Sequence, residues 1–113
     1  MKKGTFFDIL YAIFFPKKAL EKVIEETYSR VDAFLSTRNA QIISFEFYYH
    51  DIDVTFQYEG NEYKCNTDRG LIYINDKCVY KAPNIMDDDF RIDLDTTLTN
   101  LMSVLTEKLF SQD

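Results

Sequence analysis

The chain is poor in glycine, proline, cysteine and histidine and has no tryptophan: its 113 residues include 3 Gly, 2 Pro, 2 Cys and 1 His. Neither of the glycine-rich loops that cradle nucleotide phosphates, GxGxxG and GxxxxGKS/T, occurs in it. Cys65 and Cys78 are 13 positions apart, a spacing that matches neither a zinc ribbon nor a CxxC redox pair. We therefore expect two free thiols, no bound metal and no cofactor.

Positive charge becomes scarce after residue 40. Residues 1–40 carry seven Lys or Arg against five Asp or Glu, whereas residues 41–113 carry six against fourteen, so the two parts have formal charges of +2 and -8. A surface as acidic as the second part repels nucleic-acid phosphates and attracts basic proteins. The charge distribution argues against direct nucleic-acid binding and favours a basic protein partner.

Apolar and aromatic side chains are abundant, with 46% hydrophobic residues, 10 Phe and 8 Tyr. This composition is typical of a folded chain and not of a disordered one. A length of 113 residues suits one domain with its own core, and no linker divides it. We predict a single domain over residues 1–113.

The middle of the chain, residues 42–81, alternates apolar and polar residues in short runs. In residues 52–58, every second side chain from Ile52 to Tyr58 is apolar, which is the pattern of a strand with one buried face. Turn residues follow at Gly60-Asn61, at 68–70 and at 75–77. The pattern predicts an antiparallel β-meander of about five strands.

The hairpin around Gly60-Asn61 has a preferred register. A two-residue loop there sets Tyr58 opposite Tyr63 and Phe56 opposite Cys65, with the apolar side chains of both strands on one face. After Ile74, loops over residues 75–76, 76–77 or 75–77 would give different registers, and all three stay open.

The first strand is expected near residues 41–49, followed by a turn at His50-Asp51. Strict alternation places Ile43, Phe45 and Phe47 on one face and Ile42 on the other.

Helical periodicity flanks the predicted sheet on both sides. Residues 16–38 carry an apolar stripe at helical spacing, with Pro16 in the first turn. A second helix is expected to end near Phe110, capped by Asp93 or Asp95, and to pack on the sheet. The predicted fold class is therefore α+β: an N-terminal helix or two, the meander, and a C-terminal helix packed on it.

The first 15 residues are apolar from Phe6 to Phe15, with lysines on both sides and one interruption at Asp8. The run is too short to span a bilayer, and no signal cleavage site follows it. We interpret it as a helix buried on the sheet or in a homodimer, with a membrane anchor and a signal segment as alternatives.

Candidate binding residues fall into two groups. Three consecutive carboxylates interrupt the connection before the last helix, and the predicted sheet is rich in tyrosine, a residue suited to interfaces. The predicted partner-binding residues are Asp87, Asp88, Asp89, Tyr48, Tyr58 and Tyr63.

A different hypothesis uses His50, the single histidine, which alternation would place on the face of Glu46. These two residues would line a pocket between sheet and helices, for a small ligand or for catalysis. No catalytic residue is assigned, because no recognisable nucleophile motif accompanies them.

The function we expect from the sequence is a non-enzymatic protein-interaction module, such as an acidic inhibitor, immunity or adaptor protein that binds a basic partner. The alternative is the small-ligand or enzymatic domain at His50. We expect the chain in the cytoplasm, with peripheral membrane contact through residues 1–15 as the alternative location.

Overall fold

The structure, a computed structural model, describes residues 16–48 and 50–110, and the side chains from residue 19 onward. The interpretations of residues 1–15 lie outside the described residues. The chain divides inside its first described helix into two compact units, residues 1–31 and 32–113. Each unit is described by itself, and the single-domain interpretation stays a prediction.

The first described helix, α2, spans Pro16–Ser36 and begins at the proline expected in its first turn. Its part in the first unit includes a bond in which the Thr27 hydroxyl donates to the Val23 carbonyl at 2.7 Å. A turn ending at Asn39, whose φ is 63°, follows the helix. No helix among the described residues is long and apolar enough to cross a membrane.

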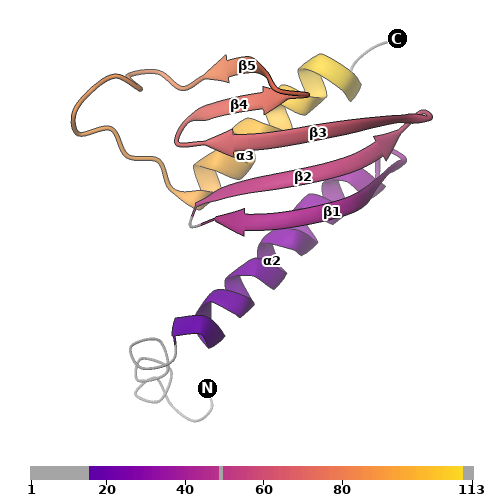
Figure 1. Cartoon of the computed structure of the whole chain (residues 1–113), viewed down its shortest axis with the longest axis horizontal. Coiled ribbons are helices and arrows are strands. Elements are labelled where there is room, and N and C mark those ends of the chain that lie inside the picture. Colours follow the sequence, from indigo (N-terminus) through magenta and orange to yellow (C-terminus); the bar gives the residue numbers. More distant parts are fainter. Residues whose placement is uncertain (1–15, 49, 111–113) are drawn as a thin grey trace. The chain divides into compact units, whose positions relative to one another are not determined.

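The second unit contains a five-stranded antiparallel sheet with the strands in sequence order, so the predicted meander and the α+β class are confirmed (Figure 1). Helix α3, Leu94–Leu105, and a π-helical turn, η1, Thr106–Phe110, follow the sheet. The strands are β1 Ala40–Tyr48, β2 Asp51–Tyr58, β3 Asn61–Asp68, β4 Leu71–Ile74 and β5 Lys77–Lys81.

The predicted register of the β2–β3 hairpin was wrong by two residues. The loop is Glu59-Gly60, and both residues have positive φ, 52° and 80°, as a type I′ turn requires. Tyr58 therefore pairs with Asn61, and Phe56 with Tyr63. A shift of two positions leaves each side chain on its predicted face.

The hairpin between β4 and β5, which the sequence left open, has the two-residue loop Asn75-Asp76. Both residues again have positive φ. Asn75 is tied to β3, since its N–H donates to the Lys64 carbonyl at 2.7 Å and its side chain accepts from the Lys64 N–H at 2.9 Å.

The predicted faces of β1 are corrected at one point. A β-bulge between Ile42 and Ser44 leaves Ile43 without a partner on β2 and 53% exposed. The extra residue reverses the alternation, so Ile42 lies on the same face as Phe45 and Phe47. Asp51, expected in the turn, already belongs to β2.

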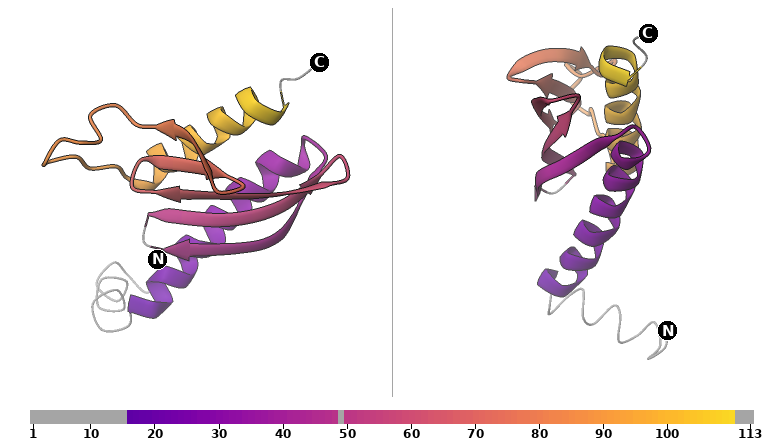
Figure 2. Two further views of the ribbon diagram at one scale, coloured as in Figure 1. Left: turned by 45° about the horizontal axis from the view of Figure 1, so that its top comes forward. Right: turned by 90° about the vertical axis from the view of Figure 1, so that its right-hand side faces the viewer.

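The core of the second unit lies between one face of the sheet and α3 (Figures 1 and 2). This packing confirms the predicted position of the C-terminal helix. Buried apolar side chains come from the end of α2, from the strands, from the residue after β5 and from α3: Leu35, Ala40, Ile52, Val54, Phe56, Cys65, Ile72, Ala82, Leu98, Leu101, Val104 and Leu105.

Candidate interaction surface

The segment between β5 and α3, residues 82–93, is the longest connection in the second unit. In Figure 1 it extends beyond the left-hand end of the sheet. Two backbone bonds shape it: the Asp87 N–H donates to the Asn84 carbonyl, and the Phe90 N–H donates to the Asp87 carbonyl, each at 3.1 Å. We call residues 84–90 the acidic loop.

The acidic loop is anchored on the turn between β3 and β4. Gly70 has a φ of +96°, and a Cβ atom there would lie 2.9 Å from the Phe90 ring and 3.2 Å from Ile85 Cδ1. The Ala82 N–H donates to the Gly70 carbonyl at 2.9 Å. Only glycine accepts both this backbone conformation and this close contact.

An open groove of about 500 Å³ lies between the acidic loop and the ends of β3, β4 and β5. Its apolar side consists of Leu71, Ile85 and Phe90, which are half-buried, and Met86, which is 89% exposed. The sequence interpretation missed this apolar side. The available signal was the presence of Ile85, Met86 and Phe90 within an otherwise acidic connection.

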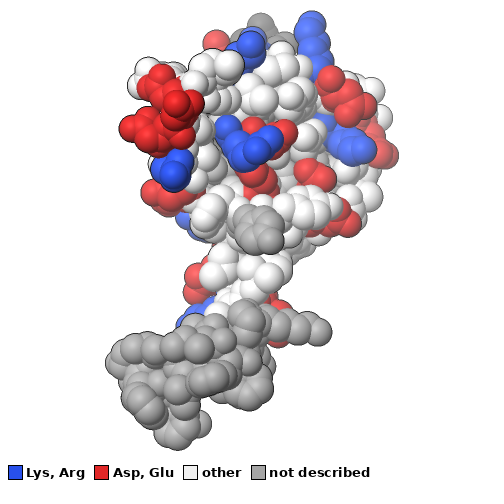
Figure 3. Space-filling model, turned by 60° about the vertical axis from the view of Figure 1, so that its left-hand side comes forward, with Lys and Arg blue, Asp and Glu red and all other residues white. Residues whose placement is uncertain are grey.

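Charged side chains border the groove. Asp68, Arg69, Lys81 and Asp87 line it, and the Arg69 Nε lies 3.2 Å from the Asp68 carboxylate in an exposed ion pair. Asp88 and Asp89 are exposed and follow Asp87 directly. On the face in Figure 3, acidic side chains lie at both margins and near the centre, and Lys and Arg side chains are interspersed with them.

Asp93 joins the acidic loop to α3 as its N-cap. The Thr96 N–H donates to the Asp93 carboxylate at 2.8 Å. Of the two caps that the sequence left open, Asp93 and Asp95, the helix therefore uses Asp93. This hydrogen bond lowers the pKa of Asp93 below its ordinary value of 3.8, and the nearby His50 contributes in the same direction.

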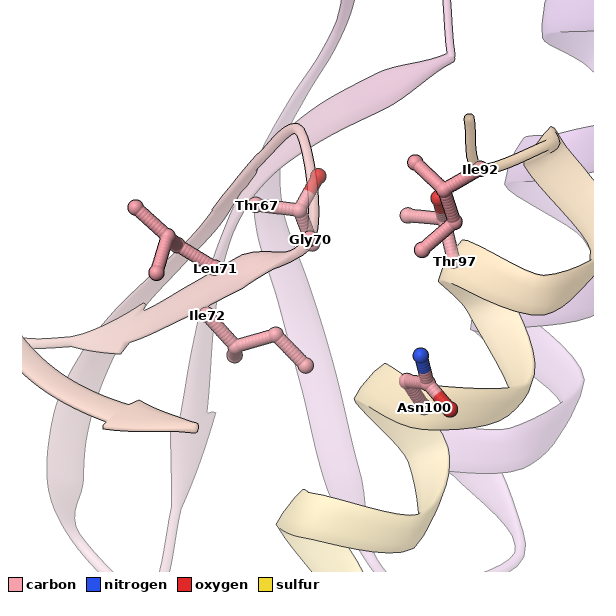
Figure 4. Close-up of a pocket in the computed structure, with 7 residues that line it drawn as sticks. All are labelled: Thr67, Gly70, Leu71, Ile72, Ile92, Thr97 and Asn100. Carbon is pink, nitrogen blue, oxygen red and sulfur yellow. The ribbon is translucent and has the colours of Figure 1, made fainter. Parts of the chain in front are cut away.

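Next to this cap, α3 packs against the β3–β4 hairpin. In Figure 4, Ile72 points from β4 toward α3, whereas Leu71 points away from the helix. The hollow that these elements enclose with Thr97 and Asn100 leaves no room for a water molecule. Side chains of β4 and α3 therefore pack closely at this contact.

The three predicted tyrosines do not join Asp87, Asp88 and Asp89 at the groove. Tyr58 and Tyr63 are half-buried near the β2–β3 turn, at the opposite end of β3 from Arg69. Tyr58 meets the Phe110 ring edge-on at 4.8 Å, and Tyr63 stacks on Phe56 at 5.6 Å.

Tyr48 is 51% exposed and lies on the sheet face opposite the core, where its hydroxyl donates to Glu46. This hydrogen bond raises the pKa of Tyr48. Its interface role stays a prediction.

The two residues of the pocket hypothesis have different surroundings. Glu46 pairs across the strands with Asp53, whose pKa is raised first by burial and then by the Glu46 charge. His50 instead lies near Asp93 at the start of α3, where its electrostatic effect lowers the pKa of Asp93. No group of three or more His, Cys, Asp or Glu suited to a metal ion occurs in the described part of the chain.

Both cysteines are free thiols, as expected. Cys65 is buried on the core face, and burial raises its pKa to about 12, so the thiol stays protonated at neutral pH. Cys78 is exposed on β5, with its thiol 3.6 Å from the Tyr80 carbonyl.

In comparisons with protein-family models, with curated proteins and with solved structures, the chain shows no significant match.

Proposed function

We propose that this protein is a non-enzymatic interaction module that binds a basic protein through its acidic loop, in the manner of an inhibitor, immunity or adaptor protein. One observation carries the proposal. Three consecutive exposed carboxylates, Asp87 to Asp89, stand beside an open groove on a loop that the Phe90 contact with Gly70 fixes in place.

The fixed geometry favours binding because a loop held by its own turns loses little conformational freedom when a partner arrives. The charge acts earlier, during encounter. Residues 85–95 contain five Asp against one Arg, and such a field accelerates association with a positively charged surface.

The partner is to be captured from source-cell lysate on the immobilised chain, eluted with a salt gradient and identified. Binding kinetics are then compared for the chain and for the triple variant Asp87→Asn, Asp88→Asn, Asp89→Asn. We expect the triple variant to associate about tenfold more slowly at low salt, with a small change in dissociation rate.

The matched control removes the same charge elsewhere, with Glu21→Gln, Glu25→Gln and Glu26→Gln on the exposed face of α2. Equal association rates for the two triple variants would contradict a specific role of the acidic loop. A small molecule bound to the purified chain, together with no retained protein, would favour the pocket hypothesis at His50 and Glu46.

A further inference from the structure

The groove has a chemical feature that the three carboxylates do not explain. Single exposed apolar residues are common on protein surfaces, but here Met86 lines the same groove as Leu71, Ile85 and Phe90. A hydrophobic concavity next to a charged rim is the arrangement in which interface anchor residues bind.

The size of the groove suits a side chain with its neighbouring backbone. Its volume of about 500 Å³ lies within the range of about 300–1,000 Å³ typical of ligand sites. Methionine has three rotatable bonds, so the exposed Met86 can adapt to an apolar group of variable shape.

The charged residues beside the groove determine which side chains of a partner can flank the bound apolar group. Asp68 and Asp87 line the groove together with Lys81 and Arg69, and Arg69 is paired with Asp68. With Asp88 and Asp89, which follow Asp87 directly, four carboxylates stand against two cations, so phosphates of nucleic acid or anionic lipid would meet a net negative charge here and be repelled. Lysine and arginine side chains would be attracted.

We infer that the groove binds a peptide segment of the partner in which one large apolar side chain, Leu, Ile, Met or Phe, is flanked by Lys or Arg. The inference rests on the proposed function and specifies its ligand. The apolar side chain contacts Met86 and Leu71, and the basic side chains face Asp87 to Asp89.

A display library of random 12-residue peptides, selected on the full chain, tests this without knowledge of the partner. We expect the enriched peptides to combine basic residues with one large apolar residue at a constant spacing. A representative peptide should bind Met86→Ser about tenfold more weakly and should keep its affinity for Ile43→Ser. Both substituted side chains are exposed, at 89% and 53%, so neither change should impair folding.

A second readout locates the bound peptide. The methyl resonance of Met86 should shift on titration with the selected peptide, while that of Met102, on α3, should not. A shift confined to Met86 supports the groove as the site, and an unchanged Met86 resonance overturns it.

The outcome of the peptide selection shows whether the inference fails alone or together with the proposed function on which it rests. Enriched peptides that are basic but have no constant apolar residue, and that lose affinity for the triple Asn variant, would overturn the anchor and leave the basic partner in place. Apolar peptides without basic residues would overturn the charge role. No enrichment, or a small molecule that occupies the groove, would overturn both the apolar anchor and the role of the charges.

Discussion

At the scale of single residues, Gly70 determines whether the acidic loop can close on the sheet. Its backbone lies at positive φ, and the Phe90 ring occupies the space a side chain would need. Gly60 provides a comparison, because its φ is +80° and no atom lies within 4 Å of the position of its Cβ.

We predict that Gly60→Ala lowers the free energy of unfolding by about 1 kcal/mol through backbone strain alone. Gly70→Ala should cost about 1–2 kcal/mol more, because the ring of Phe90 must also move. Urea unfolding of both variants measures the difference. In a Phe90→Ala background the difference between the two glycine substitutions should become smaller, with the Ile85 contact at 3.2 Å accounting for what is left; an undiminished difference would refute the role of the ring.

At the scale of elements, the turn between the acidic loop and α3 depends on one carboxylate. The Asp93 pKa is lowered in the folded chain, so ionised Asp93 stabilises the fold at pH values above its unfolded pKa. That contribution is lost as the pH falls through the lowered folded pKa.

We predict that Asp93→Asn keeps a capping hydrogen bond but loses this pH dependence. The wild type should be the more stable protein near neutral pH, and the difference should shrink as the pH falls below about 4. Thermal unfolding from pH 7 to pH 2 measures it, with Asp88→Asn as the control because Asp88 lies outside the capping turn. A constant difference across this range would show that charge at the cap is unimportant.

The hairpins show a second regularity of the elements. The loops Glu59-Gly60, Arg69-Gly70 and Asn75-Asp76 each contain two residues with positive φ. This geometry matches the right-handed twist of the strands, which explains why three successive hairpins use it.

At the scale of the whole molecule, the excess of negative charge favours electrostatic self-repulsion. The net charge is -6, and the Arg69–Asp68 pair is highly exposed, with side-chain exposures of 85% and 49%. Exposed pairs of this kind contribute little to stability, whereas excess charge of one sign opposes folding.

We therefore predict that NaCl stabilises the protein, because the Debye length falls from about 10 Å at 0.1 M to about 3 Å at 1 M. The urea midpoint should rise with salt. The rise should be smaller for the variant with Asn at positions 87–89, whose net charge is closer to zero. A midpoint that falls with salt would mean that ion pairs dominate.

Much of the fold was predictable because its signals are local. Period-two alternation and turn residues specified the meander, and the apolar spacing after Asp93 specified α3. The errors in strand register arose where a shift of one residue in a loop or bulge changes which residues pair. The bulge at Ile43 and the loop at Glu59-Gly60 depend on pairing with a neighbouring strand, which the local sequence does not encode.

The candidate site was predictable only in part. The run Asp87 to Asp89 can be read directly from the sequence, so these three carboxylates were named before the fold was known. The contact of Phe90 with Gly70 joins positions twenty residues apart, and no periodic pattern links them.

The amino-acid sequence by itself determined the fold class, the strand order and the acidic character of the second part of the chain, because periodicity and charge are properties of neighbouring residues. Only the tertiary structure decided which side chains share a surface. It placed Asp87 beside Leu71 and Met86 in one groove, and it kept Tyr58 and Tyr63 at the other end of β3. Strand register and loop closure bring such distant residues together, and both depend on packing across the whole unit.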